Sequence, residues 1–181
     1  DIETINLFFN LETARDVRSA HGPAKVIAAN NVLAHVDDPK EFLCGCVALA
    51  SDDGLIVIEV PYLRDLVERF EYDTIYHEHL CYFSVTAMAH LCAAANLAIV
   101  RVDHAPVHGG SLRIHARPAP RFSAHQPSVE RQMDGERADG LTGLARYTQF
   151  ADAVASNRRS LVDLLQQMKQ KGRTLGAYGA P

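Results

Sequence analysis

Two short and nearly uninterrupted apolar runs, Lys25–Ala29 and Leu55–Val60, lie in the first third of the chain. Runs of this length and composition are typical of strands that are buried on both faces. Between them, Asp38 has the features of a helix N-cap because Pro39 follows at the first helical position. A strand, a helix and a second strand in this order predict a βαβ unit with two parallel strands.

Three further helices are predicted from capping residues and helix-ending residues. The first begins after Asn10 and ends before Gly22, the second runs from Pro61 to Phe70, and the third follows Ser84 and covers Val85–Ala95. The alternation of helices with apolar strands favours a doubly wound α/β sheet, with helices packed against it.

The pattern changes after residue 96. Leu97–Val102 and Ser111–Ala116 have the composition of strands, and Gly109 and Gly110 lie in the connection between them. A short connection with two glycines predicts an antiparallel hairpin, and such a pair commonly forms the edge of a parallel sheet. We therefore expect residues 1–117 to form one α/β domain that ends in an antiparallel edge.

The last third of the chain has helical composition. Residues 118–128 are rich in proline and predict a linker, whereas residues 129–171 predict helix, and Thr174–Tyr178 predicts the start of a new strand. An apolar stripe at helical spacing predicts that this helix packs by one face, with part of the stripe left bare or covered by a second copy of the chain. The stripe consists of Leu161, Leu164, Leu165 and Met168.

Composition narrows the function classes. The chain has 181 residues, 48% of them apolar and 22% charged, with a net charge of −4. These values are typical of a soluble globular protein, and they favour neither a nucleic-acid nor a membrane partner. The longest apolar run is too short for a transmembrane helix, and the N-terminus has no signal-peptide pattern. The four cysteines have no disulfide or zinc spacing, which favours reduced thiols and a cytoplasmic location.

The residue types that could carry chemistry gather between positions 72 and 84. Tyr76, Glu78 and His79 lie within four residues, and a turn would bring them together. A histidine can act as a base near neutral pH, a carboxylate can fix its tautomer, and a phenol can donate to a developing oxyanion. The alternative interpretation is a polar connection in which these groups only satisfy backbone hydrogen bonds.

Other histidines suggest two more interpretations. His77 and His79, with His108 or His104, could supply three imidazoles to a metal ion, although the nearest known architecture with this His-x-His spacing is an all-β barrel, unlike this helix-rich chain. His35 follows the strand that ends at Ala29, at the strand end where open α/β sheets bind ligands. The sequence contains no glycine-rich dinucleotide loop, no phosphate-binding loop and no nucleophile elbow.

Three segments together resemble a known enzyme family. They are residues 29–36 (Ala-Asn-Asn-Val-Leu-Ala-His-Val), residues 72–79 (Tyr-Asp-Thr-Ile-Tyr-His-Glu-His) and residues 107–113 (Val-His-Gly-Gly-Ser-Leu-Arg). In this order and spacing they resemble the S-adenosylmethionine-dependent sugar C-methyltransferases, which include the 3-C-methyltransferases of deoxysugar biosynthesis. The resemblance implies a class I, Rossmann-like methyltransferase sheet with a C-terminal helical extension.

The resemblance also implies a substrate and a set of roles. The substrate would be a nucleotide-linked 4-keto-6-deoxysugar, methylated at C3 after a base removes the proton beside the ketone. His79 matches the base, and Tyr76, Glu78 and His35 match the residues that orient it and the sugar. Asn30 and Asn31 would lie near the methionine part of the cofactor. The substrate loop would be formed by His108, Gly109 and Gly110.

Some parts of the family pattern are expected outside this sequence. The cysteine-rich zinc module and the glycine-rich cofactor loop of the family would precede Asp1, so the sheet is expected to be incomplete at its N-terminus. Residues 129–181 would be a helical segment and the start of a second, Rossmann-like domain. Besides the methyltransferase, two hypotheses remain: a metal-dependent enzyme that uses His77, His79 and His108, and a non-catalytic fragment or paralogue of the methyltransferase fold.

Overall fold

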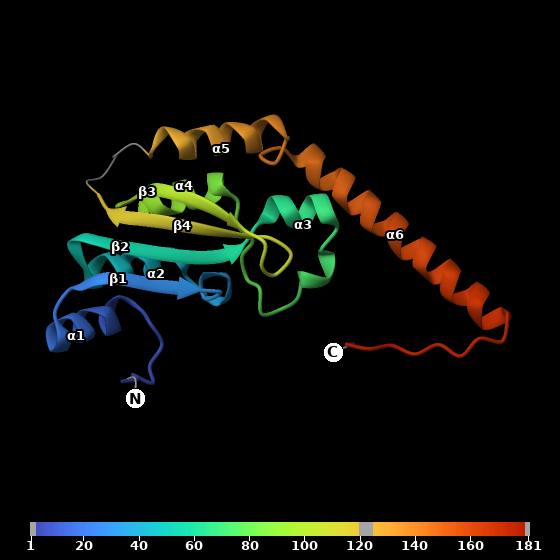
Figure 1. Ribbon diagram of the computed structural model, residues 1–181, viewed down its shortest axis with the longest axis horizontal. Helices are drawn as coiled ribbons and strands as arrows, with labels where there is room; N and C mark the ends of the chain where they lie inside the picture. The colour runs from blue at the N-terminus through green and yellow to red at the C-terminus, as the bar shows by residue number, and fades with distance from the viewer. Residues whose placement is uncertain (1–2, 120–124, 180–181) are drawn as a thin grey trace. The chain divides into compact units, whose positions relative to one another are not determined.

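The computed structural model describes residues 3–119 and 125–179 of the chain (Figure 1). It contains two compact units, Asp1–Thr142 and Gly143–Pro181. The first unit has a mixed α/β architecture, and the second consists of one long helix and the residues that follow it.

The elements of the first unit alternate along the chain as the sequence predicts. From the N-terminus to the second strand they are α1 (Leu11–His21), β1 (Ala24–Asn30), the 3₁₀ helix η1 (Leu33–His35), α2 (Pro39–Leu49) and β2 (Ala50–Pro61). They continue with α3 (Leu63–Arg69), the 3₁₀ helix η2 (Tyr72–Thr74), α4 (Val85–Ala94), β3 (Leu97–Ala105), β4 (Ser111–Pro118) and α5 (Pro127–Ala138).

The four strands form one sheet in the order β1-β2-β4-β3. β1 pairs with β2 in parallel, with Ala28 opposite Val57, and this confirms the predicted parallel pair. β4 pairs antiparallel with both β2 and β3, which confirms the predicted antiparallel edge. Since β4 returns between β2 and β3, the two strands beside it run in the same direction.

Three polar side chains begin helices where the sequence predicts. The Asn10 side chain accepts a hydrogen bond from the Thr13 backbone N–H at 2.8 Å at the start of α1. Asp38 and Ser84 do the same at the starts of α2 and α4, at 2.9 and 3.0 Å. Each cap satisfies a backbone donor that has no partner inside the helix. These local contacts fix where the helices begin relative to the strands.

The hydrophobic core lies between the sheet and the helices α2 and α4, which cover the same face (Figure 1). Ile56, Ile58 and Val60 project from alternate positions of β2 into this core and are fully buried. Leu43 from α2 and Met88 from α4 are also fully buried in it. Because this layer is close-packed, the ends of β1 and β2 are held on a rigid base.

α5 is joined to the rest of the first unit by a fully buried carboxylate. Glu136 accepts hydrogen bonds from the backbone N–H groups of Val85 and Thr86 at 2.7 and 2.8 Å. It also accepts from the hydroxyls of Thr86 and Tyr62, at 2.6 and 2.9 Å. Two of these donors are at the N-terminus of α4, where a negative charge is favourable. Burial of the Tyr62 phenol, together with the nearby carboxylate, raises the pKa of Tyr62.

The C-terminal part of the chain differs from the sequence prediction. The predicted helical stretch is two helices, α5 and α6 (Leu144–Gln170), and the compact units divide after Thr142 rather than in residues 118–128. Residues 120–124 of the predicted linker and the final two residues lie outside the described part of the chain. α5 belongs to the first unit because it packs against α4 and β3.

Of the two expectations for the second unit, one is met in part and the other is not met. The four residues of the predicted stripe on α6 are 40% to 49% exposed, so the stripe does not pack as predicted but is bare, an outcome that the sequence allowed for part of it; these residues are Leu161, Leu164, Leu165 and Met168. The prediction of a strand at Thr174–Tyr178 is wrong, because these described residues are not hydrogen-bonded to another strand. A run with strand composition becomes a strand only when a neighbour supplies its hydrogen bonds. Across residues 3–119 and 125–179, no helix combines the length and the apolar character needed to cross a membrane.

The Glu136 contacts generate a stability prediction. Replacing Glu136 with Ala leaves four donors without their acceptor, so the free energy of unfolding should fall by about 3 kcal/mol or more. Urea denaturation followed by circular dichroism measures this change. Glu130→Ala is the matched control, since Glu130 is an exposed carboxylate on the same helix. Equal stabilities of the two variants would contradict a role for Glu136 in attaching α5.

Candidate functional site

A cavity of about 340 Å³ lies where β1 and β2 end. Asn31 follows β1, Pro61 is the last residue of β2, and Tyr62 follows it. The remaining lining residues are Ala34, His35, Leu66, Glu71, Thr74, Tyr76, His79 and His108. Open α/β sheets place ligands at this carboxyl edge of their strands, so the cavity is in the expected position for a binding site.

Backbone hydrogen bonds bring the polar segment around His79 to this edge. The Leu80 and Cys81 backbone N–H groups donate to the Ala34 carbonyl at 2.8 and 3.3 Å. Within the segment, the His79 N–H donates to the Tyr76 carbonyl at 3.1 Å and closes a turn. As a result His35 and His79, which are 44 positions apart, have ring centroids only 4.9 Å from each other.

The protonation of His79 is fixed by its two neighbours. Its Nδ1 lies 2.8 Å from the Thr74 carbonyl oxygen, and a carbonyl can only accept, so Nδ1 carries the hydrogen. In the neutral ring, Nε2 then has a free lone pair, and the Tyr76 hydroxyl donates to it at 3.1 Å. The Tyr76 and His79 rings are 4.3 Å apart and tilted by 37°. Nε2, the atom that can accept a proton, therefore faces the Tyr76 hydroxyl, and both residues line the cavity.

His35 is held in a similar way. Its Nδ1 lies 2.9 Å from the Glu78 carbonyl oxygen, and so this nitrogen also carries the hydrogen. Glu78 therefore contacts the site through its backbone, while its side chain is exposed. The atom that fixes the His79 tautomer is the Thr74 carbonyl oxygen, not the Glu78 carboxylate that the sequence suggested.

The other predicted residues are distributed unevenly around the cavity. Asn31 lines it and has a left-handed backbone (φ 53°), whereas Asn30 is the last residue of β1 and lies outside the lining. His108 lines the cavity, whereas Gly109 and Gly110, which follow it in the loop between β3 and β4, lie outside the lining. His77 is exposed. The residues that the structure describes contain no group of three His, Cys, Asp or Glu side chains suited to a metal ion.

Sequence reasoning missed the three polar lining residues Tyr62, Glu71 and Thr74. Tyr62 directly follows β2, so the strand-end rule that selected His35 could also have selected it. Thr74 contributes a carbonyl oxygen, which has no signature in the sequence. Glu71 follows the left-handed residue Phe70 (φ 59°), and nothing in the pattern predicts that this bend turns its carboxylate toward the cavity.

A second cavity of about 500 Å³ adjoins the first and shares Asn31 and His35 with it. Its lining also includes Phe8, which is 95% exposed, and the acidic residues Asp37, Asp38 and Glu41. An exposed aromatic ring near carboxylates suits a ligand with both a flat heterocycle and a positive charge.

Two family models and a relative match this chain, and all three are methyltransferases. Residues 2–102 match the family model described as a methyltransferase domain. Residues 106–181 match the model described as the C-methyltransferase C-terminal domain. The chain is 36% identical over 180 residues to the C-methyltransferase NovU of Streptomyces niveus. The alignment covers 99% of this chain and 43% of that relative, so the chain spans less than half of its length.

Solved structures show more distant similarity. One is the O-methyltransferase NcsB1 of neocarzinostatin biosynthesis, in complex with S-adenosylmethionine and 2-hydroxy-5-methyl naphthoic acid. It is 19% identical, with a TM-score of 0.42 and coverage of 53% of this chain and 30% of its own. Another is the magnesium protoporphyrin IX methyltransferase ChlM of Synechocystis, which is 11% identical with a TM-score of 0.42. That alignment covers 54% of this chain and 46% of ChlM.

The contacts of His79 generate a spectroscopic prediction. Nitrogen-15 NMR should show the neutral ring with hydrogen on Nδ1, because the Thr74 carbonyl accepts from that atom. Tyr76→Phe should leave the tautomer unchanged, since it removes only the donor to Nε2. His90, an exposed histidine on α4, gives the reference signal of an unconstrained ring. A spectrum of the neutral His79 ring with hydrogen mainly on Nε2 would contradict the assignment.

Proposed function

The chain belongs to the methyltransferase-domain family, and from this membership we propose that the protein is an S-adenosylmethionine-dependent C-methyltransferase. We propose further that it acts at C3 of a nucleotide-linked 4-keto-6-deoxysugar and that it works in the cytoplasm. The C-methyltransferase model at residues 106–181 and the identity to NovU support carbon as the methylated atom. The four cysteines, all within the described residues, are free, which suits a reducing compartment.

The single observation that carries the proposal is the pairing of His79 Nε2 with the Tyr76 hydroxyl at the cavity. Methylation at a carbon beside a ketone requires a base to remove the carbon-bound proton. It also requires a donor to stabilise the charge that develops on the ketone oxygen. His79 and Tyr76 supply one group of each kind, 3.1 Å apart.

In the proposed mechanism, the sugar enters between these two side chains. The Tyr76 hydroxyl turns from Nε2 to the ketone oxygen, and Nε2 accepts the proton from C3. The ring becomes positively charged, and its Nδ1–H bond to the Thr74 carbonyl strengthens because the donor is now ionised. His35, held beside it by the Glu78 carbonyl, orients the sugar.

In this proposal, S-adenosylmethionine would occupy the second cavity. Asn31 at the end of β1, the exposed Phe8 ring and the carboxylates of Asp37 and Asp38 would hold it, next to the sugar cavity that shares Asn31 and His35. When bound, the cofactor supplies an electrophilic methyl group to the carbon from which His79 has removed the proton. Asn31 and His35, which line both cavities, would then lie between the cofactor and the sugar.

Replacement of His79 tests the proposal. In the protein expressed from its whole gene, His79→Asn should lower methyl transfer by about 10²–10⁴-fold, the usual contribution of a general base. Binding of S-adenosylhomocysteine should be unchanged, because His79 lies outside the second cavity. The variant should also exchange the C3 proton with deuterium far more slowly when S-adenosylhomocysteine blocks transfer.

His77→Asn is the matched control, since His77 is a neighbouring histidine with an exposed side chain. It should retain both methyl transfer and exchange. Exchange at the wild-type rate in His79→Asn would assign the base to another group, such as Glu78, Tyr76 or His35. Failure of the whole protein to bind S-adenosylhomocysteine would instead favour a non-catalytic role for the fold.

A further inference from the structure

We propose that Asp65 is a positioning residue, which binds the loop Val107–Gly110 to α3 and so determines where His108 lies in the sugar cavity. The inference rests on the proposed function, because it assigns the cavity to the sugar substrate. Asp65 itself lies outside the cavity lining and would act only through the loop.

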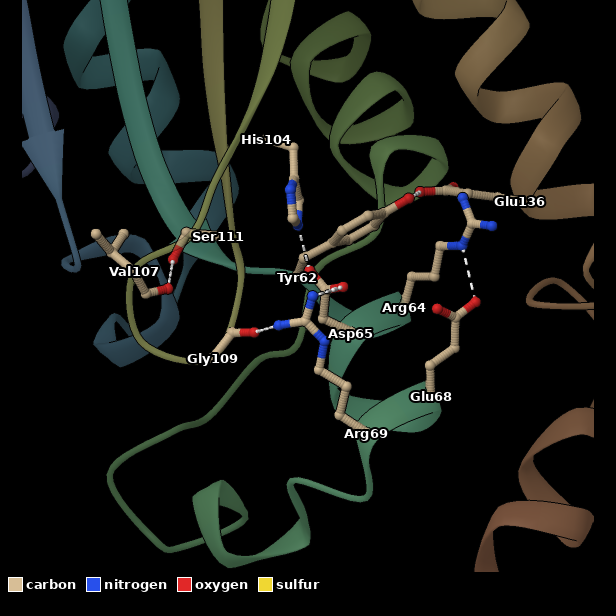
Figure 2. A network of polar contacts seen from close by, with 10 residues as sticks. All are labelled: Tyr62, Arg64, Asp65, Glu68, Arg69, His104, Val107, Gly109, Ser111 and Glu136. Atoms are coloured by element: carbon tan, nitrogen blue, oxygen red, sulfur yellow. Dashed lines mark hydrogen bonds and ion pairs between the residues drawn. The ribbon is translucent and has the colours of Figure 1, made fainter.

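Asp65 is a buried carboxylate with two basic partners. It is 6% exposed, although Glu68 and Arg69 on the same short helix α3 are exposed. Its Oδ2 lies 2.5 Å from His104 Nε2, and its Oδ1 lies 3.4 Å from the guanidinium of Arg69 (Figure 2). A buried carboxylate is unfavourable unless such partners compensate it. The charge of Asp65 is therefore matched to His104 and Arg69.

The loop backbone lies directly against two carboxylates. A Cβ atom at Gly110 would overlap the Asp65 carboxylate, and one at Gly109 would overlap the Glu71 carboxylate. Both glycines also have positive φ angles, 143° and 80°, which residues with side chains rarely adopt. Gly109 and Gly110 therefore allow the loop backbone to approach Asp65 on α3 and Glu71, which follows the helix.

Arg69 connects the carboxylate to the loop. Its guanidinium donates a hydrogen bond to the Gly109 carbonyl and pairs with Asp65 at the same time (Figure 2). The Tyr62 backbone N–H donates to the Gly110 carbonyl at 2.9 Å, and the Ser111 hydroxyl donates to the Val107 carbonyl at 3.1 Å. These bonds fix both ends of the loop, while Asp65 and Arg69 fix its middle.

The contacts of Asp65 and Arg69 with the loop determine the position of His108. It has a left-handed backbone (φ 50°), which is unfavourable for a residue with a side chain and persists only when its surroundings enforce it. It lines the cavity together with Glu71. Without the Asp65 charge, Arg69 and His104 lose their shared acceptor, the loop can relax, and His108 leaves its position.

Asp65→Asn tests this role, because the amide keeps the size of the side chain and removes its charge. In the whole protein, KM for the sugar substrate should rise at least about tenfold, the effect of losing a charge-assisted hydrogen bond, while kcat changes less. The affinity for S-adenosylhomocysteine should stay the same. Glu68→Gln is the matched control: its carboxylate, on the same helix, pairs at the surface with Arg64, and its kinetics should equal those of the wild type.

A second measurement separates this inference from the proposed function. Hydrogen exchange of the Gly110 amide, which donates to the Val107 carbonyl at 3.0 Å, should become faster in Asp65→Asn, and NMR signals of the His108 ring should shift. Arg69→Gln, which leaves the buried carboxylate in place, should produce the same loosening if Asp65→Asn folds poorly. Unchanged exchange and unchanged KM in these variants would overturn the role of Asp65. Faster exchange in a protein that binds no nucleotide-linked sugar would support the role of Asp65 and reject the proposed substrate.

Discussion

The parallel pairing of β1 with β2 is the constraint on which the site depends. Because the two strands run in the same direction, Asn31 and Tyr62 emerge at the same edge of the sheet. The two amide groups of Leu80 and Cys81 then join the segment around His79 to the Ala34 carbonyl in η1. An antiparallel pair would have placed these ends on opposite edges, and His35 and His79 could not have met.

Backbone carbonyl groups, rather than side-chain carboxylates, fix the state of the two site histidines. The Thr74 and Glu78 carbonyl oxygens each accept from an Nδ1, so in each neutral ring Nε2 is the atom that can accept, and in His79 it accepts from Tyr76. Carboxylates in the same region have other contacts: Asp65 binds the glycine loop through Arg69, and Glu136 holds α5 against α4. The charged residues thus place the elements, and uncharged peptide groups orient the atoms that would take part in proton transfer.

The sequence predicts the first unit well because its signals are local. Asn10, Asp38 and Ser84 act on backbone groups three residues away, and a buried strand such as β2 is apolar along its own length. The site is less predictable, since Glu71 and the Thr74 carbonyl enter it through a left-handed bend and a peptide group. The strand expected at Thr174–Tyr178 failed for a related reason: a strand requires a partner, and its composition alone cannot supply one.

The most direct measurement for the central claim is the position of the transferred methyl group. The whole protein would be incubated with a nucleotide-linked 4-keto-6-deoxysugar and S-adenosylmethionine that carries carbon-13 in its methyl group, and the product would be examined by NMR. A labelled methyl carbon bonded directly to C3 of the sugar is the predicted result. A methyl group on oxygen, or on another ring carbon, would contradict the account.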